Sequence, residues 1–280
     1  MTNIDEMSIN AIRVLSADAI QKANSGHPGL PLGTAPTAYE LWTNHMNYNP
    51  ADPKWENRDR FVLSKGHTAP ALYGVLAEKG FFDREWLFTL NDGGTKLPSH
   101  PDRLKTPGVD MTTGSLGQGT SAAAGIATGF KMNKTDQYVY LIVGDGELNE
   151  GQCWEAFQYI AHYKLNHCVV IIDDNKKQLD GTTKEVMNPF SIENKMKAFG
   201  FYTQTVKGND EEAIDEAINR AKNVKDQAVC IILDSIKGAG VPYFEQLDAN
   251  HSVKFNNDTI KKATKDAIKE LDEFIKGGAR

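Results

Sequence analysis

The sequence predicts an α/β protein with a doubly wound, mainly parallel β-sheet that is flanked by helices. Three β-branched and nearly all-apolar runs, at 138–143, 168–173 and 228–233, alternate with helical stretches. Strands that are apolar on both faces are typical of a parallel sheet covered by helices on each side. The chain of 280 residues is long enough to bury a core without disulfide bonds or structural metal ions. Its composition, with 40% hydrophobic and 24% charged residues, excludes disordered and collagen-like proteins. We therefore expect one domain over residues 1–280.

The first ninety residues are predicted to contain three helices and one strand. Apolar residues at helical spacing predict a helix over residues 1–23, which the turn-forming residues 24–26 end. A Gly/Pro-rich segment follows, and after it Thr34–His45 is predicted as a second helix. The next elements expected are a polar loop over 47–60, a short strand that starts at Phe61 and a helix over 69–80.

A long loop is predicted over residues 91–120, because this segment shows little periodicity. A loop of that length inside a compact domain is usually functional. Further helices are predicted at 120–133, where one face is rich in Ala and Gly, at 151–164, at 210–223 and at about 257–276. The last of these is charged and amphipathic, which is typical of a helix that covers a core and faces solvent on its other side.

Charge and composition exclude several classes of partner. With 31 basic and 37 acidic side chains the net charge is -6, which disfavours nucleic acid and anionic membranes as partners. The N-terminus does not resemble a secretory signal, and no apolar run approaches the roughly 20 residues that span a bilayer. Cys153, Cys168 and Cys230 fit no zinc-ligand spacing, so we interpret them as reduced thiols and expect a cytoplasmic protein.

Polar residues follow the predicted inner strands, at the edge of the sheet where parallel α/β proteins bind ligands. Asp145 lies between Gly144 and Gly146, and Asn175 ends the next strand. The two side chains and a backbone carbonyl would supply three hard oxygen ligands to Mg²⁺ and leave further positions for phosphate and water. On its own, the Gly-Asp-Gly sequence also suits a tight strand-to-helix turn capped by Asp145.

Five motifs together resemble a known family. The sequence GDGELNEG, followed by DDNK, resembles the thiamine diphosphate motif. In addition, ANSGHPG, LSKGH, SHPD and GSLGQG occur in the order found in transketolase. The resemblance covers about residues 5–255 and is to the N-terminal, diphosphate-binding subunit of a split transketolase. It implies the thiamine diphosphate-binding fold.

The resemblance also implies roles for individual residues. Asp145, Asn175 and the carbonyl of Lys177 would bind Mg²⁺, or Ca²⁺ or Mn²⁺ in its place, and Gly146 would donate to the cofactor's diphosphate. The other implied cofactor contacts are His67 at the diphosphate, Gly114, Ser115 and Leu116 at the ring end, and Glu150 in a carboxylate network at the subunit contact. An acid in the first turn of a helix, at the favourable end of the helix dipole, is the alternative interpretation of Glu150.

Three histidines are candidate catalytic residues by the same resemblance. His27 and His100 would face the ketose donor, where imidazole can donate to an alkoxide or accept a hydroxyl proton because it titrates near neutral pH. His251 aligns only by its position after Gly240 and Val241, because its neighbours, ANHSVKF, depart from the family. A contact of His251 with diphosphate or substrate and an ordinary loop histidine are both open interpretations.

The implied reaction is the transfer of a two-carbon ketol unit from a ketose phosphate to an aldose. The family's pyrimidine-binding half, with the glutamate that activates the cofactor, has no counterpart in the chain, so we expect a separate partner subunit in an α2β2 assembly. Alternatives are a transketolase for branched or sulfonated ketoses, a subunit related to deoxyxylulose-phosphate synthase or to the α-subunit of 2-oxo acid dehydrogenases, and a catalytically silent binding subunit.

Overall fold

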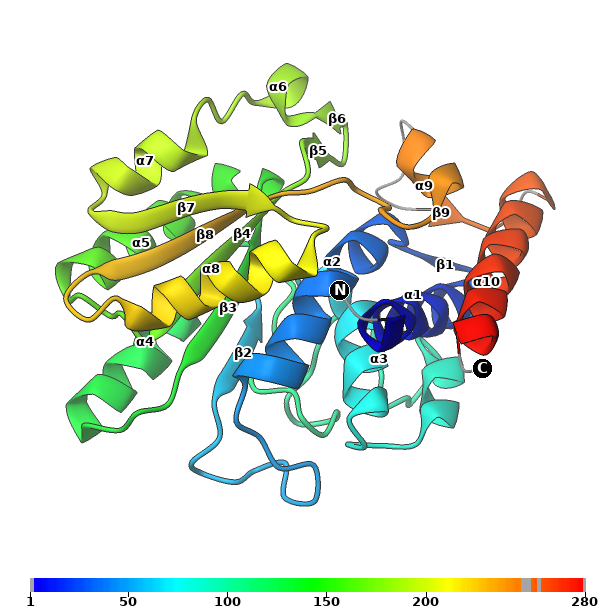
Figure 1. Ribbon diagram of the computed structural model, residues 1–280, viewed down its shortest axis with the longest axis horizontal. Helices are drawn as coiled ribbons and strands as arrows, with labels where there is room; N and C mark the ends of the chain where they lie inside the picture. Colours follow the sequence, from blue (N-terminus) through cyan, green and yellow to red (C-terminus); the bar gives the residue numbers. More distant parts are fainter. Residues whose placement is uncertain (1–2, 248–252, 256–257, 279–280) are drawn as a thin grey trace.

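Five parallel strands form the central sheet, in the order β2-β3-β4-β8-β7 (Figure 1). The computed structural model describes residues 3–247, 253–255 and 258–278. Within them the strands are β2 (Arg60–Leu63), β3 (Val139–Gly144), β4 (Cys168–Asp174), β7 (Phe201–Lys207) and β8 (Ala228–Asp234). The predicted fold class, a parallel sheet flanked by helices, is confirmed.

Helices cover both faces of the sheet. The α-helices of the described residues are α1 (Asn3–Lys22), α2 (Gly29–Glu40), α3 (Ala69–Glu78), α4 (Gln118–Asn133), α5 (Gly151–His162), α6 (Thr183–Val186), α7 (Ile192–Ala198), α8 (Glu211–Asn223), α9 (Pro242–Gln246) and α10 (Asp258–Gly278). Alternate strand residues point to opposite faces. Tyr140 and Ile171 therefore pack in the core under α1, α2, α3 and α8, whereas Leu141 and Ile172 pack in the core under α4, α5 and α7.

Strand β7 was not among the predicted elements. Its sequence, FYTQTVK, has three consecutive polar residues at its centre, and only Phe201 is fully buried. It lies at the edge of the sheet and pairs with β8 alone. An edge strand is partly solvated, so it lacks the continuous apolar run that identifies β3, β4 and β8.

Helix α2 begins at Gly29, five residues before the predicted start at Thr34. Because of Pro31, this first turn was not predicted as helical. A proline is nevertheless tolerated there, because the first backbone N–H groups of a helix have no hydrogen-bond partner within it. The helix continues past Pro36 and ends in a π-helical turn, Leu41–His45. The predicted end of the element at His45 agrees with the structure.

Two small antiparallel pairs lie outside the main sheet. Strand β1 (Ser25–Gly26) pairs with β9 (Val253–Lys254), and β5 (Lys177–Gln178) pairs with β6 (Gly181–Thr182). Helix α10, which contains most of the predicted covering helix, packs against α1. Across the described ranges, no helix is long and apolar enough to cross a membrane. Cys153, Cys168 and Cys230 are buried free thiols.

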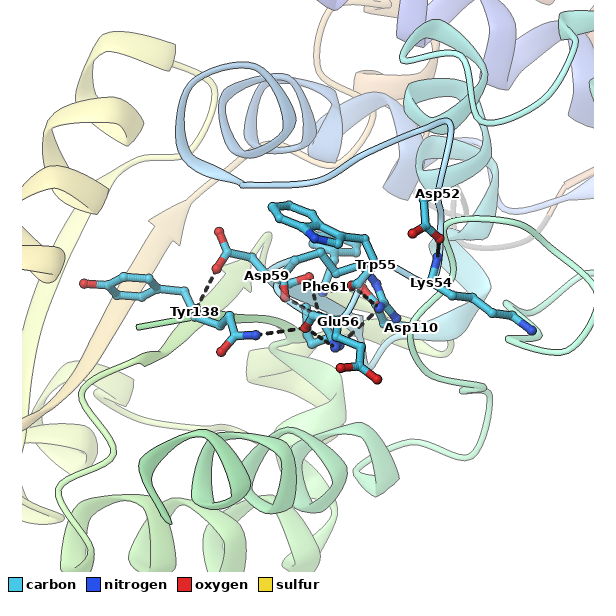
Figure 2. A network of polar contacts seen from close by, with 11 residues as sticks. Asp52, Lys54, Trp55, Glu56, Asp59, Phe61, Asp110 and Tyr138 are labelled. Carbon is cyan, nitrogen blue, oxygen red and sulfur yellow. Dashed lines mark hydrogen bonds and ion pairs between the residues drawn. The ribbon is translucent and has the colours of Figure 1, made fainter. Parts of the chain in front are cut away.

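Residues 91–117 contain no helix or strand, in agreement with the predicted long loop. Asp110 fixes this loop at the edge of the sheet where the strands begin (Figure 2). Its carboxylate accepts from Phe61 N at 2.9 Å and pairs with Arg58 at 2.8 Å. Nearby, Asp59 accepts from Asn47 N at 2.8 Å and from Tyr138 N at 2.7 Å. The loop is thus anchored where the strands begin, while Gly117 at its C-terminal end donates to Glu147, which follows the carboxyl end of β3.

Candidate functional site

A cleft of about 460 Å³ lies at the carboxyl ends of β3 and β4. It brings together nine residues that the sequence analysis singled out: His27, His67, His100, Gly114, Leu116, Asp145, Gly146, Asn175 and Lys177. Ser115 and Glu150 are exposed and do not line the cleft. His251 lies outside the described residues. Polar groups from five separate segments therefore converge on one cavity, at the carboxyl ends of the strands, where ligands bind in parallel α/β proteins.

Asp145 and Asn175 present oxygen atoms at adjacent strand ends. Asp145 is 3% exposed, and its carboxylate accepts from Gly146 N at 2.8 Å and from Lys176 N at 2.7 Å. Asn175 Oδ1 accepts from Lys177 N at 3.2 Å. Burial, followed by the nearby Asp173 carboxylate, raises the pKa of Asp145 to about 7. A divalent cation would favour the ionised form, and the hard oxygen donors match Mg²⁺.

A buried ion pair lies behind these candidate ligands. Asp173 contacts the Lys65 ammonium and the Ser235 hydroxyl, and it accepts from Asn175 Nδ2 at 3.0 Å. Burial raises the pKa of the Asp173 carboxyl, but Lys65 and the hydrogen bonds outweigh burial, so the pKa lies below its ordinary value. Asp173 stays ionised and orients the Asn175 amide, which turns Oδ1 away from it.

Lys237 adds a second buried cation near the cleft. It is 3% exposed, and burial lowers its pKa to about 8, although Asp145 and Asp173 act in the opposite direction. Sequence analysis did not single out Lys65, Asp173 or Lys237. A signal was present, because each is a charged residue at the end of an apolar run, but only the fold reveals which of the charges face one another.

The three histidines that line the cleft come from different segments. His27 lies between β1 and α2, and its ring centroid is 5.1 Å from that of His67. Burial first, and then His100 and Lys237, lower the pKa of His27 to about 4. Burial also lowers the pKa of His100. Both rings are therefore neutral at neutral pH and can accept a proton or donate a hydrogen bond.

Glycines make room around the cleft. A Cβ atom at Gly146 would lie 2.9 Å from Gln178 Cβ, and one at Gly66 would lie 3.0 Å from Gly114 N. A Cβ atom at Gly114 would come within 3.4 Å of the His100 ring. The predicted diphosphate donor, Gly146 N–H, bonds to Asp145 in the structure. At Gly146 and Gly66, therefore, a side chain would collide with a neighbouring segment.

The fold and the cleft define an α/β protein with a ligand site at the carboxyl ends of parallel strands. A family described as "Transketolase, thiamine diphosphate binding domain" matches residues 4–272. The chain belongs to this family.

Relatives of two lengths resemble the chain. It is 43% identical to the 6-deoxy-6-sulfo-D-fructose transketolase subunit of Clostridium sp. (strain MSTE9), over 93% of this chain and 95% of that subunit. It is 39% identical to the transketolase of Halalkalibacterium halodurans, over 95% of this chain and 41% of that protein. The solved transketolase of Campylobacter jejuni superposes with a TM-score of 0.88 at 32% identity, over 100% of this chain and 47% of that one. The chain thus spans less than half of these two transketolases.

Proposed function

We propose that the chain is the N-terminal subunit of a two-subunit transketolase, which transfers a two-carbon ketol unit from a ketose phosphate to an aldose. The observation that carries the proposal is the cleft, in which two oxygen ligands and three histidines converge in a thiamine diphosphate-binding domain. The Clostridium relative supports the two-subunit arrangement, because that protein is named as a subunit and has a similar length.

Asp145, Asn175 and the carbonyl of Lys177 would bind a divalent cation, most suitably Mg²⁺, and His67 and the backbone at Gly146 would bind the diphosphate. Gly114, Ser115 and Leu116 would contact the ring end of the cofactor. When bound, thiamine diphosphate supplies the nucleophilic carbon and the electron sink. The chain's own task is to orient the cofactor and the sugar and to move protons.

His27 and His100 are the proposed proton-transfer residues. As neutral imidazoles on the cleft wall, they can accept a proton from a sugar hydroxyl or donate a hydrogen bond to a carbonyl oxygen that gains charge. Their depressed pKa values keep them in the form that accepts protons. His251 is proposed as a further contact to diphosphate or substrate, by its position in the sequence.

A separate pyrimidine-domain subunit is the proposed partner, in an α2β2 assembly. Glu150 immediately precedes α5 and is exposed, so it is accessible to a second polypeptide. We propose that it lies at the subunit contact. The wall of the cleft from this chain contains no glutamate other than Glu147 among the described residues, and Glu147 is fully engaged with its own chain, so the activating glutamate would come from the partner.

We also propose that residues 1–280 form a single domain of a cytoplasmic protein. Two hydrophobic clusters pack on opposite faces of the same sheet, which supports one folding unit. Three buried free thiols suit a reducing compartment.

Reconstitution tests the proposed function. The chain is mixed with the candidate partner, of which the product of the neighbouring reading frame is the first choice, together with thiamine diphosphate and Mg²⁺. Ketose phosphate and 6-deoxy-6-sulfo-fructose are offered as alternative donors, with an aldose phosphate as acceptor. We expect two-carbon transfer only from the mixture. Activity from this chain alone would contradict the two-subunit proposal, and a cofactor-loaded mixture that transfers no ketol unit would contradict the reaction.

A further inference from the structure

Glu147 is a buried carboxylate beneath the cleft. It lies in the 3₁₀ turn Gly146–Asn149, two residues after Asp145, and it is 3% exposed. The residue also lines the cavity. A carboxylate removed from water in this way is retained only when its oxygen atoms are well hydrogen-bonded.

Three donors from three separate segments meet at this carboxylate. Oε1 accepts from Ser64 Oγ at 2.5 Å and from Gly117 N at 2.8 Å, and Oε2 accepts from Gly144 N at 3.1 Å. Each donor is close in sequence to a candidate cofactor contact. Ser64 is three residues before His67, Gly117 follows Leu116, and Gly144 precedes Asp145.

The same segments also pack closely against one another. A Cβ atom at Gly119 would lie 2.7 Å from Ser64 Cα. Thr113 Oγ1 donates to Leu63 O at 2.7 Å. The end of β2 and the segment 113–119 therefore have little room to shift independently, and Glu147 is the side chain that also ties both to the end of β3.

We propose that Glu147 is a positioning residue, whose carboxylate holds the diphosphate, metal and ring-end contacts of the cofactor site in a fixed mutual geometry. The inference deepens the proposed function and rests on it. Glu147 does not touch the cofactor in this scheme. It acts through Ser64, Gly117 and Gly144.

The chemistry of the three donors explains why a carboxylate is required. An ionised carboxylate only accepts hydrogen bonds, so both oxygen atoms can face N–H and O–H groups. A glutamine of the same shape would place an NH₂ group against at least one of those donors. Glu147→Gln therefore keeps the volume of the side chain and disturbs its hydrogen bonds.

The test is calorimetric titration of the chain, reconstituted with its partner subunit, with thiamine diphosphate at saturating Mg²⁺. For Glu147→Gln we expect cofactor affinity to fall about tenfold or more, the usual range for residues that orient ligand-binding groups. Asp59→Asn is the matched control, because Asp59 is also a buried carboxylate that accepts two backbone N–H groups, but at the opposite edge of the sheet (Figure 2). Its affinity should match that of the unmodified chain.

Unfolding midpoints, measured in parallel, separate positioning from stability. Both variants should be less stable, but only Glu147→Gln should bind the cofactor more weakly. Equal affinity for Glu147→Gln and the unmodified chain would overturn the positioning role and leave the proposed function intact. An assembly of the unmodified chain with its partner subunit that binds no thiamine diphosphate would instead overturn the proposed function, and the inference with it.

A second variant covers the case in which Glu147→Gln does not fold. Ser64→Ala removes one of the three donors and leaves the carboxylate in place. We expect a smaller loss of cofactor affinity in the same direction. Unchanged affinity in Ser64→Ala, with Glu147→Gln either unfolded or also unchanged, would overturn the proposal.

Discussion

Replacement of Asp145 by Asn should stabilise the cation-free chain at alkaline pH while it removes the response to Mg²⁺. Asp145 is almost completely buried next to the ionised Asp173. Without a cation, the ionised form of Asp145 is therefore unfavourable in the folded protein. Asn has nearly the same shape and carries no charge.

The magnitude follows from the pKa. A rise from 3.8 to about 7 in the folded chain corresponds to about 4 kcal/mol of unfolding free energy, at about 1.4 kcal/mol for each pH unit. Because the pKa of Asp145 is raised in the folded protein, its contribution to the free energy of unfolding is present in full below the ordinary pKa of 3.8 and is lost as the pH rises through about 7. The amide NH₂ group of Asn would face the backbone N–H of Gly146 or of Lys176 and could not accept its hydrogen bond, which lowers the free energy of unfolding by about 1–3 kcal/mol. A net gain of about 1–3 kcal/mol at pH 8 remains.

Urea denaturation followed by circular dichroism measures the effect. Both chains are unfolded in a chelator at several pH values between about 5 and 8, and the free energies of unfolding are compared. The stability of the unmodified chain should fall relative to that of Asp145→Asn as the pH rises. Addition of Mg²⁺ with thiamine diphosphate should stabilise the unmodified chain and not the variant.

Two results would refute this reasoning. Parallel pH dependences of the two chains in chelator would mean that Asp145 does not carry the raised pKa. Equal stabilisation of both chains by Mg²⁺ with thiamine diphosphate would mean that Asp145 is not a ligand. Glu216→Gln, on the exposed face of α8, serves as a control for the loss of one negative charge.

Three further predictions concern other parts of the structure. In the reconstituted enzyme, His100→Ala should lower turnover and leave cofactor affinity nearly unchanged; equal losses of both would contradict a role at the substrate. His27, with its pKa lowered to about 4, contributes stability that is present above its ordinary pKa of 6.5 and is lost as the pH falls towards 4. His27→Gln should therefore flatten the acid side of the stability profile, and an NMR titration of His27 near pH 6.5 would contradict this. Asp110→Ala leaves Arg58 without its buried partner and should lower the free energy of unfolding, measured by urea denaturation, by about 3 kcal/mol. As a control, Arg84→Ala removes the exposed ion pair with Glu78 and should change the free energy of unfolding by less than about 1 kcal/mol. Similar losses for the two variants would show that the contacts of Asp110 add little stability.

The inner strands were predictable because their environment is uniform. Strands β3 and β4 are buried on both faces, so their sequences are apolar throughout. Strand β7 meets solvent at the edge of the sheet, and its mixture of apolar and polar residues is a weaker signal. Helix α2 was predicted to start too late, because Pro31 usually indicates a loop, although a proline is tolerated in the first turn of a helix.

The cleft residues were predictable where a motif places them at a strand end, as with Asp145 and Asn175. The residues behind them were not. The ion pair of Lys65 with Asp173 joins positions that are 108 residues apart, and the bonds of Glu147 reach back 83 residues to Ser64. Such pairings depend on which strands are neighbours, and spacing along the chain carries no information about that. The predicted roles of all the site residues, His251 among them, remain predictions.

The position of β8 has a consequence for biosynthesis. Strand β8 is the last of the five in sequence, yet it lies between β4 and β7. During translation, therefore, β4 emerges with one edge unpaired, and β7 has no neighbour until residues 228–234 leave the ribosome. Unpaired strand edges promote aggregation, and contacts between distant segments form slowly. Release of a nascent chain before β8 would leave an open sheet, which makes the shortened products of interrupted synthesis natural substrates for chaperones and proteases.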